Sequence, residues 1–128
     1  MGAETSPCAC LSSCFDADDN EFYSASTRKA RKAHECCECE SWIQPSETYE
    51  RAVGKSYGEV WAYNTCSLCV EIRTHFYCNG GWLFTQLWDE MRDQLFEENA
   101  FRFECMEGLS VAAREKVLGQ WRKWKGIE

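Results

Sequence analysis

The sequence predicts a small α+β domain, and three observations lead to this prediction. Two Cys-x-x-Cys pairs, at 36–39 and 66–69, are separated by 26 residues. β-Branched and aromatic side chains fill the interval between the pairs, and apolar residues recur at helical spacing toward the C-terminus. At 128 residues the chain has the length of one compact domain. We divide it into an irregular cysteine-containing arm (1–20), a knuckle and hairpin module (21–80) and a helical C-terminal part (81–128) packed on the same domain.

The N-terminal segments lack a regular pattern. Residues 1–20 are rich in small and acidic side chains, which indicates an irregular arm. Residues 21–35 are first aromatic and then basic, and we interpret them as an extended lead-in to the first cysteine pair. A Gly-Lys-Ser-Tyr-Gly segment then separates two stretches rich in β-branched and aromatic residues. A β-hairpin is therefore expected, with strands near 48–54 and 58–64.

Three helices are expected after the hairpin. A short helix should open at the second cysteine pair and end at Asn79-Gly80-Gly81. Another should span 82–98, where the apolar residues at helical spacing are Phe84, Leu87, Trp88, Met91 and Leu95. The last should span 110–124 with Ser110 as its N-cap. Its apolar stripe consists of Val117, Leu118, Trp121 and Trp124.

The two cysteine pairs form a candidate zinc site. Zinc prefers four soft ligands at the corners of a tetrahedron, and each Cys-x-x-Cys turn brings two thiolates close together. The predicted ligands of one zinc ion are Cys36, Cys39, Cys66 and Cys69. The order knuckle, hairpin, second pair and helix is typical of a treble clef, so we expect a zinc-stabilised, treble-clef-like domain followed by C-terminal amphipathic helices. A closed shell of four cysteines has no open coordination position, which indicates a structural zinc.

The other six cysteines leave alternatives open. The candidates for a second zinc ion, which would fix the arm, are Cys8, Cys10, Cys14, Cys37 and Cys78. These residues could equally be small buried apolar side chains, and Cys105 has no assigned role. His34 could replace Cys36 or Cys37 as a ligand of the first knuckle, or it could face solvent.

The ten cysteines fit either a disulfide scaffold in an oxidising compartment or metal sites in a reducing one. The N-terminus has neither the basic start nor the apolar run of a secretion signal, and no stretch is long enough to span a membrane. We therefore interpret the chain as a cytoplasmic protein with metal sites rather than disulfides, and without a membrane partner. Its net charge of −7 argues against a generic nucleic-acid binder.

Five features in about 30–75 carry a resemblance. They are the basic lead Ala30 to Lys32, the Cys-Cys-x-Cys knuckle at Cys36 to Cys39, the turn Glu47 to Glu50, the hairpin glycine Gly54 and the Thr-Cys-x-x-Cys at Thr65 to Cys69. With them the segment resembles small zinc-binding proteins of unassigned role encoded by bacteriophages and prophages. The resemblance implies a phage or prophage origin and expression in a bacterial cytoplasm. It implies no particular activity.

Two binding functions are open at this point. The first is a protein that binds and modulates a host bacterial protein, for example as a counter-defence inhibitor of a CRISPR-type nuclease complex. The excess of Trp and Tyr favours it, because these residues concentrate in interface hot spots. The second is a zinc finger that binds nucleic acid, with His34 and Trp42 near for stacking. The basic residues of this alternative are Arg28, Lys29, Arg31 and Lys32.

An enzyme is not expected. Treble-clef nucleases place histidines beside the zinc, because their chemistry needs a base and a metal ligand near the scissile phosphate. The chain has two histidines, His34 and His75, without His-His or His-x-x-x-His spacing. His75, on the helix after the second cysteine pair, is the one candidate, and we expect it at the surface.

Overall fold

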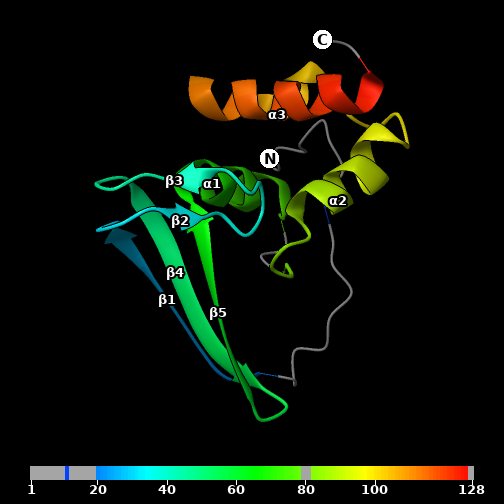
Figure 1. The fold of residues 1–128 in the computed structure, drawn as a ribbon. Helices are drawn as coiled ribbons and strands as arrows, with labels where there is room; N and C mark the ends of the chain where they lie inside the picture. The colour runs from blue at the N-terminus through cyan, green and yellow to red at the C-terminus, as the bar shows by residue number, and fades with distance from the viewer. Residues whose placement is uncertain (1–10, 12–19, 79–81, 127–128) are drawn as a thin grey trace, which may run out of the picture.

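The computed structural model describes Leu11, residues 20–78 and residues 82–126 (Figure 1). Five strands, β1 to β5, come first, and three α-helices follow, with a π-helical turn after α2 and a 3-10 turn before α3. The fold class is therefore α+β, as predicted. The predicted arm at 1–20 lies outside the described residues apart from Leu11 and Asn20.

The main sheet has three antiparallel strands. In spatial order these are β1 (Asn20–Lys29), β4 (Thr48–Ser56) and β5 (Glu59–Cys66). β4 and β5 form the predicted hairpin, and each ends two residues later than expected from 48–54 and 58–64. The two residues between them, Tyr57 and Gly58, both have positive φ (52° and 78°), as in the type I′ turn that matches the twist of a hairpin.

The segment 21–35, expected to be an extended lead-in to the knuckle, forms strands of the two sheets. Most of it forms β1, which pairs antiparallel with β4 along its length. Its end forms the short strand β2 (His34–Glu35), which pairs with β3 (Trp42–Ile43) on the other side of the knuckle. β1 was not evident as a strand because its residues from Tyr23 to Lys29 are all exposed, so they show no apolar alternation.

The three helices are α1 (Ser67–Phe76), α2 (Leu87–Met91) and α3 (Val111–Lys125). α1 opens at the second cysteine pair as predicted and ends before the expected stop at 79–81, which lies outside the described residues. α3 agrees with the prediction to within one residue. The hydroxyl of Ser110 accepts a hydrogen bond from the N–H of Ala113 at 3.2 Å, and Gly126 ends the helix with a φ of 81°.

The helix predicted over 82–98 begins only at Leu87. Thr85 has a φ of 73°, a left-handed conformation that an α-helix does not contain. The carboxylate of Glu38 accepts hydrogen bonds from the N–H groups of Thr85 (3.0 Å) and Leu87 (3.1 Å), where α2 starts. This contact comes from the distant knuckle, so apolar spacing alone placed the start wrongly. After α2 the chain continues through the π-helical turn (Arg92–Phe96).

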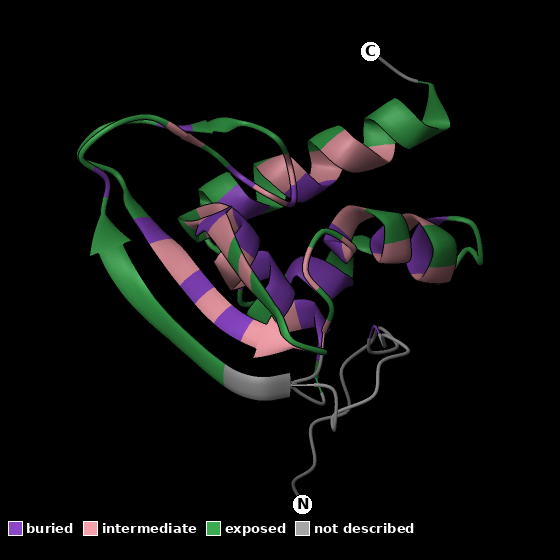
Figure 2. Cartoon of the chain, turned by 60° about the horizontal axis from the view of Figure 1, so that its bottom comes forward, coloured by how far each residue is buried: buried purple, intermediate pink, exposed green. Residues whose placement is uncertain are grey.

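The core lies between the main sheet and the helices. Its most buried apolar side chains are Leu11, Ile43, Ile72, Leu87, Met91, Leu95 and Val117. Figure 2 shows buried positions alternating with partly exposed ones along the central strand β4, beside the exposed edge strand β1. Leu11 is 1% exposed, and its N–H donates to the carbonyl of Phe76 at 2.9 Å, so this position is fixed to the end of α1.

Candidate metal centre and cationic pocket

The structure brings the four cysteines of the predicted zinc site into one cluster. They are Cys36, Cys39, Cys66 and Cys69, and their sulfur atoms all lie within 4.8 Å of one another. The Sγ atoms of Cys39 and Cys66 are 3.9 Å apart. Four sulfurs bound to zinc at about 2.3 Å in a tetrahedron would be about 3.8 Å apart. The cluster is therefore shaped to hold one metal ion.

Backbone geometry positions these sulfurs. The first pair lies on a tight turn closed by a hydrogen bond from the N–H of Glu40 to the carbonyl of Cys36 (3.0 Å). Cys66 ends β5, and Cys69 lies in the first turn of α1, where the helix N-terminus favours negative charge. The N–H groups of Glu38 and Cys66 also donate to the Sγ of Cys36, at 3.4 and 3.3 Å. Two backbone donors therefore contact the sulfur of this buried cysteine.

Two of the four cysteines are shielded from water, and the cluster has a basic neighbour. Cys36 and Cys69 are both 0% exposed. The hydrogen bond with Cys39 raises the pKa of Cys36, but hydrogen bonds with Cys66 and Cys69 outweigh it and lower that pKa to about 6. Lys116 of α3 reaches the cluster, where burial lowers its pKa and the charge and hydrogen bond of Cys39 raise it by more. This ammonium group can offset part of the negative charge of bound thiolates.

Cys37 and His34, the alternative ligands of the first knuckle, lie outside the cluster. The Sγ of Cys37 is 3.4 Å from the hydroxyl oxygen of Thr65, and burial raises the pKa of this thiol to about 12. The Nδ1 of His34 is 3.5 Å from the amide nitrogen of Asn64, and its ring centroid is 5.0 Å from that of Tyr49. The first pair therefore contributes its two Cys-x-x-Cys sulfurs and no other side chain.

The described residues hold no second cluster of metal-binding side chains. Cys78 and Cys105 each take part in a disulfide bond. A disulfide sulfur has no thiolate to offer a metal, and the second zinc site that includes Cys78 stays a prediction. The structure therefore holds disulfide sulfurs in addition to the candidate metal cluster. The remaining candidates, Cys8, Cys10 and Cys14, lie outside the described residues.

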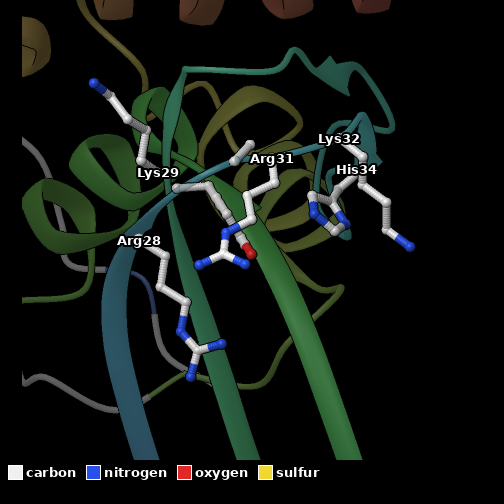
Figure 3. Close-up of a pocket in the computed structure, with 7 residues that line it drawn as sticks. Arg28, Lys29, Arg31, Lys32 and His34 are labelled. Carbon is white, nitrogen blue, oxygen red and sulfur yellow. The ribbon is translucent and has the colours of Figure 1, made fainter.

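The basic residues of the nucleic-acid alternative line one open cavity of about 920 Å³. We call it the cationic pocket, and its lining consists of Arg28, Lys29, Ala30, Arg31, Lys32, His34 and Tyr49. Figure 3 shows the guanidinium groups of Arg28 and Arg31 in front of the strands, whereas Lys29 points away from them. The two arginines therefore present their planar groups to the same space.

A backbone corner at the end of β1 creates this pocket. The N–H of Ala30 donates to the carbonyl of Glu47 (2.9 Å), and the carbonyl of Ala30 accepts from the N–H of Ser46 (2.8 Å). The chain bends immediately afterwards, so side chains before and after the corner line the same cavity. Tyr49 of β4 forms the floor, buried beneath the ring of His34.

The positive charge of the pocket is not neutralised by ion pairs within the described part of the chain. The ion pairs found there join Arg73 to Glu50 and Arg92 to acidic residues on its own segment. Arg28 donates instead to the neutral hydroxyl of Ser26 at 3.1 Å. In a chain with a net charge of −7, the pocket is therefore a local positive region.

His75, the one candidate for catalysis, takes part in the packing of the fold. Its Nε2 lies 2.6 Å from the carbonyl oxygen of Cys105, and its ring packs edge-on against Phe76 at 4.9 Å between centroids. It is half-buried, not at the surface as expected. The absence of enzymatic activity stays a prediction.

Two side chains that shape the metal centre gave no signal in the sequence. Lys116 lies on a different helix, and neither spacing nor composition distinguishes it from the other lysines of the sequence. Glu38 lies inside the knuckle and joins it to α2. The pKa of its carboxyl group is raised, because the effect of burial outweighs that of the hydrogen bonds from Leu87 and Thr85, which lower it. Only the tertiary structure brings these partners together.

Comparison with models of protein families, with curated proteins and with solved structures finds no match to this chain. The phage or prophage origin implied by the resemblance therefore stays a prediction. No helix in the described ranges is both long enough and apolar enough to cross a membrane. The function has to be inferred from the chemistry of the cluster and the pocket.

Proposed function

We propose that this chain is a zinc-stabilised protein that binds nucleic acid through the cationic pocket. The observation that carries the proposal is the gathering of Arg28, Lys29, Arg31 and Lys32 around one cavity without an ion pair in the described part of the chain. Affinity for nucleic acid comes mainly from Lys and Arg contacts with phosphates. A cluster of this kind in an otherwise acidic protein gives the ligand a defined place to bind.

Zinc is the metal that suits the cysteine cluster best. Four thiolates at tetrahedral spacing select zinc or an iron–sulfur centre, and a closed four-cysteine shell is typical of structural zinc. The pairing register places Cys66, at the end of β5, opposite Tyr49, the floor of the pocket. The proposed role of the metal is therefore to fix the end of the sheet on which the pocket is built.

The lining of the pocket can supply two kinds of contact. Arg28 and Arg31 carry planar guanidinium groups, which bind phosphate oxygens in pairs. The ring of His34, supported by Tyr49, offers a surface on which a base can stack. We expect binding with little sequence preference, because the contacts are to phosphates and ring faces.

Fluorescence anisotropy of a labelled oligonucleotide with zinc-loaded protein tests this function. Affinity should fall steeply with salt, and the double variant R28Q/R31Q should reduce the slope of log K against log salt by about 1.4, since each contact with a single strand contributes about 0.7. The matched control is R122Q/K123Q, which removes two exposed charges from α3. Absent or salt-independent binding, or equal losses in both variants, would contradict the proposal.

Binding to a protein of a bacterial host, as in a counter-defence inhibitor, is a second proposal. Exposed apolar side chains favour it: at the hairpin turn Tyr57 is 77% exposed and Val60 is 73% exposed, and Trp42 on β3 is 60% exposed. Large exposed aromatic side chains are typical of interface hot spots. The variant Y57S/V60S should lose a partner captured from nuclease-treated bacterial lysate, and R28Q/R31Q should keep it. If the wild-type chain captures no protein, this second proposal is wrong.

A further inference from the structure

The cationic pocket continues into one face of the main sheet. Alternate residues of a strand point to the same face, so Tyr49, Arg51 and Lys55 of β4 share a face. The pairing register places Arg28 of β1 beside Tyr49 and Val60 of β5 beside Lys55, on that same face. We call it the outer face. Its cations therefore run in a line from the pocket toward the hairpin turn.

The opposite, inner face is covered along much of β4 and β5 and carries the acidic groups. Glu50 on this face pairs with the buried guanidinium of Arg73 in α1 at 2.8 Å. Trp61 and Tyr63 pack against Phe84, with ring centroids 5.7 and 4.7 Å apart. Along the described side chains of the three strands, the outward positions hold cations and no carboxylate. The described carboxylates of the sheet therefore lie on the inner face, which also carries Lys29 at the end of β1.

The outer face is open to a ligand. Ser24, Ser26 and Val60 on it are exposed, and Figure 1 shows the three strands extending away from the helices toward the β4–β5 turn. The Nη1 of Arg51 donates to the Oδ1 of Asn64 at 3.1 Å, which holds the guanidinium group over this face. In the described ranges Arg51 forms no ion pair with a carboxylate.

We propose that the outer face extends the cationic pocket into a path for single-stranded nucleic acid. Arg51 and Lys55 bind phosphates beyond those held by Arg28 and Arg31. This inference rests on the function proposed above, and it adds the class of ligand and two binding residues. Charge complementarity indicates a polyanion as the ligand, because a line of cations that form no ion pairs with the described residues attracts one.

The dimensions of the face favour one strand rather than a duplex. From Tyr49 to Lys55 it is about 20 Å long at about 3.3 Å per residue, which matches a few nucleotides at about 3.4 Å or more each. Three strands about 4.8 Å apart, with their side chains, are too broad for a major groove about 12 Å wide. A flat surface with arginine planes instead suits unpaired bases.

The test uses the zinc-loaded full chain and labelled oligodeoxyuridylates of about 3 to 20 nucleotides, a length range that brackets the path. Oligouridylates and a DNA duplex of matching length are measured in parallel. Three double variants each remove two positive charges: R51Q/K55Q from the sheet, R28Q/R31Q from the pocket and R122Q/K123Q from the exposed side of α3 as the control. The single variant K55Q repeats the sheet measurement with a smaller change, and bound zinc is measured for every variant.

The wild-type affinity should increase with oligonucleotide length until the path is filled. R51Q/K55Q should reach its plateau at a shorter length. The loss of affinity relative to the wild type should be about 25-fold larger at about 0.1 M salt than at about 1 M salt. The reason is that the variant lacks two phosphate contacts, each of which contributes about 0.7 to the salt slope. K55Q should show about a fivefold loss on the same basis. The α3 control should bind like the wild type.

The possible failures are distinguishable. If R51Q/K55Q binds like the α3 control while R28Q/R31Q is weakened, the path along the sheet is wrong and the proposed function stands. If the wild-type chain binds no oligonucleotide, the proposed function itself is wrong. Duplex binding as tight as single-strand binding overturns the assignment to one strand. A preference for the ribose or the deoxyribose strand supports the path and identifies RNA or DNA as the ligand.

Discussion

The strand-rich part of the chain and its helical C-terminal part are stabilised by different means. The part up to Phe76 has a sheet with one uncovered face, and its two cysteine pairs meet in one cluster. The part from Trp82 onward closes the core with the buried side chains Leu87, Met91, Leu95 and Val117. A small sheet packed on one side buries little apolar surface, so a metal can supply the stability that packing supplies elsewhere. The comparison suggests that the metal is what allows the outer face to stay open for a ligand.

Replacing Cys69, a fully buried member of the cluster, should have the largest effect. Cys69→Ser leaves three thiolates, and structural zinc contributes on the order of 10 kcal/mol or more to folding. We expect loss of bound zinc and of the three-stranded sheet, measured by metal analysis and by exchange of the β4 amides.

Cys37→Ser is the matched control in the same knuckle. Its thiol lies against Thr65 and outside the cluster, so the variant should keep one bound metal ion. A Cys69→Ser protein that keeps its sheet without metal would show that packing alone stabilises both parts.

Leu95→Ala tests the helical part. Leu95 is fully buried in the turn that follows α2, and truncating a buried leucine costs about 2–5 kcal/mol through lost contacts and a cavity. The free energy of unfolding should fall by this amount while the zinc content is unchanged. Val111→Ala, at an exposed position of α3, should change stability by no more than about 0.5 kcal/mol. Loss of zinc in Leu95→Ala would contradict the separation of the two kinds of stabilisation.

Glu38→Gln should weaken the contact that joins the two parts. Both carboxylate oxygens accept backbone hydrogen bonds at the start of α2, and an amide has only one oxygen to accept them. One buried N–H then lacks an acceptor, which costs about 1–3 kcal/mol. Urea denaturation should show this loss, together with faster hydrogen exchange at Leu87. Glu40→Gln, an exposed change in the same knuckle, should leave both measurements unaltered.

The sequence was most informative where structure depends on neighbouring residues. The spacing of the cysteines predicted the cluster, the glycine-flanked turn predicted the β4–β5 hairpin, and Ser110 predicted the start of α3. In each case the determining contacts lie within a few residues or repeat a fixed ligand spacing. The cluster of four cysteines could be predicted without the overall topology, because the hairpin between the two pairs brings the second pair back to the first.

The errors lie where distant segments meet. The start of α2 depends on Glu38 in the knuckle, and the basic neighbour of the cluster, Lys116, comes from α3. The disulfide bonding of Cys78 and Cys105 could not be separated from metal binding by counting cysteines. The cationic pocket was half predicted: the basic residues were identified, but the cavity needs the corner at Ala30 and the floor at Tyr49.

Two glycines, one in each part, provide the finest comparison. Gly58 in the hairpin turn has a φ of 78° and open space where a Cβ would lie, so Gly58→Ala introduces only backbone strain of about 1 kcal/mol. Gly119 in α3 has helical geometry and open space, so Gly119→Ala should stabilise the protein by about 0.5–1 kcal/mol, through helix propensity and a less flexible unfolded chain. Thermal unfolding of both variants should therefore shift in opposite directions from the wild type. Equal shifts of the same sign would contradict this prediction. The added methyl group would then affect stability in the same way at both positions, although only Gly58 has a positive φ.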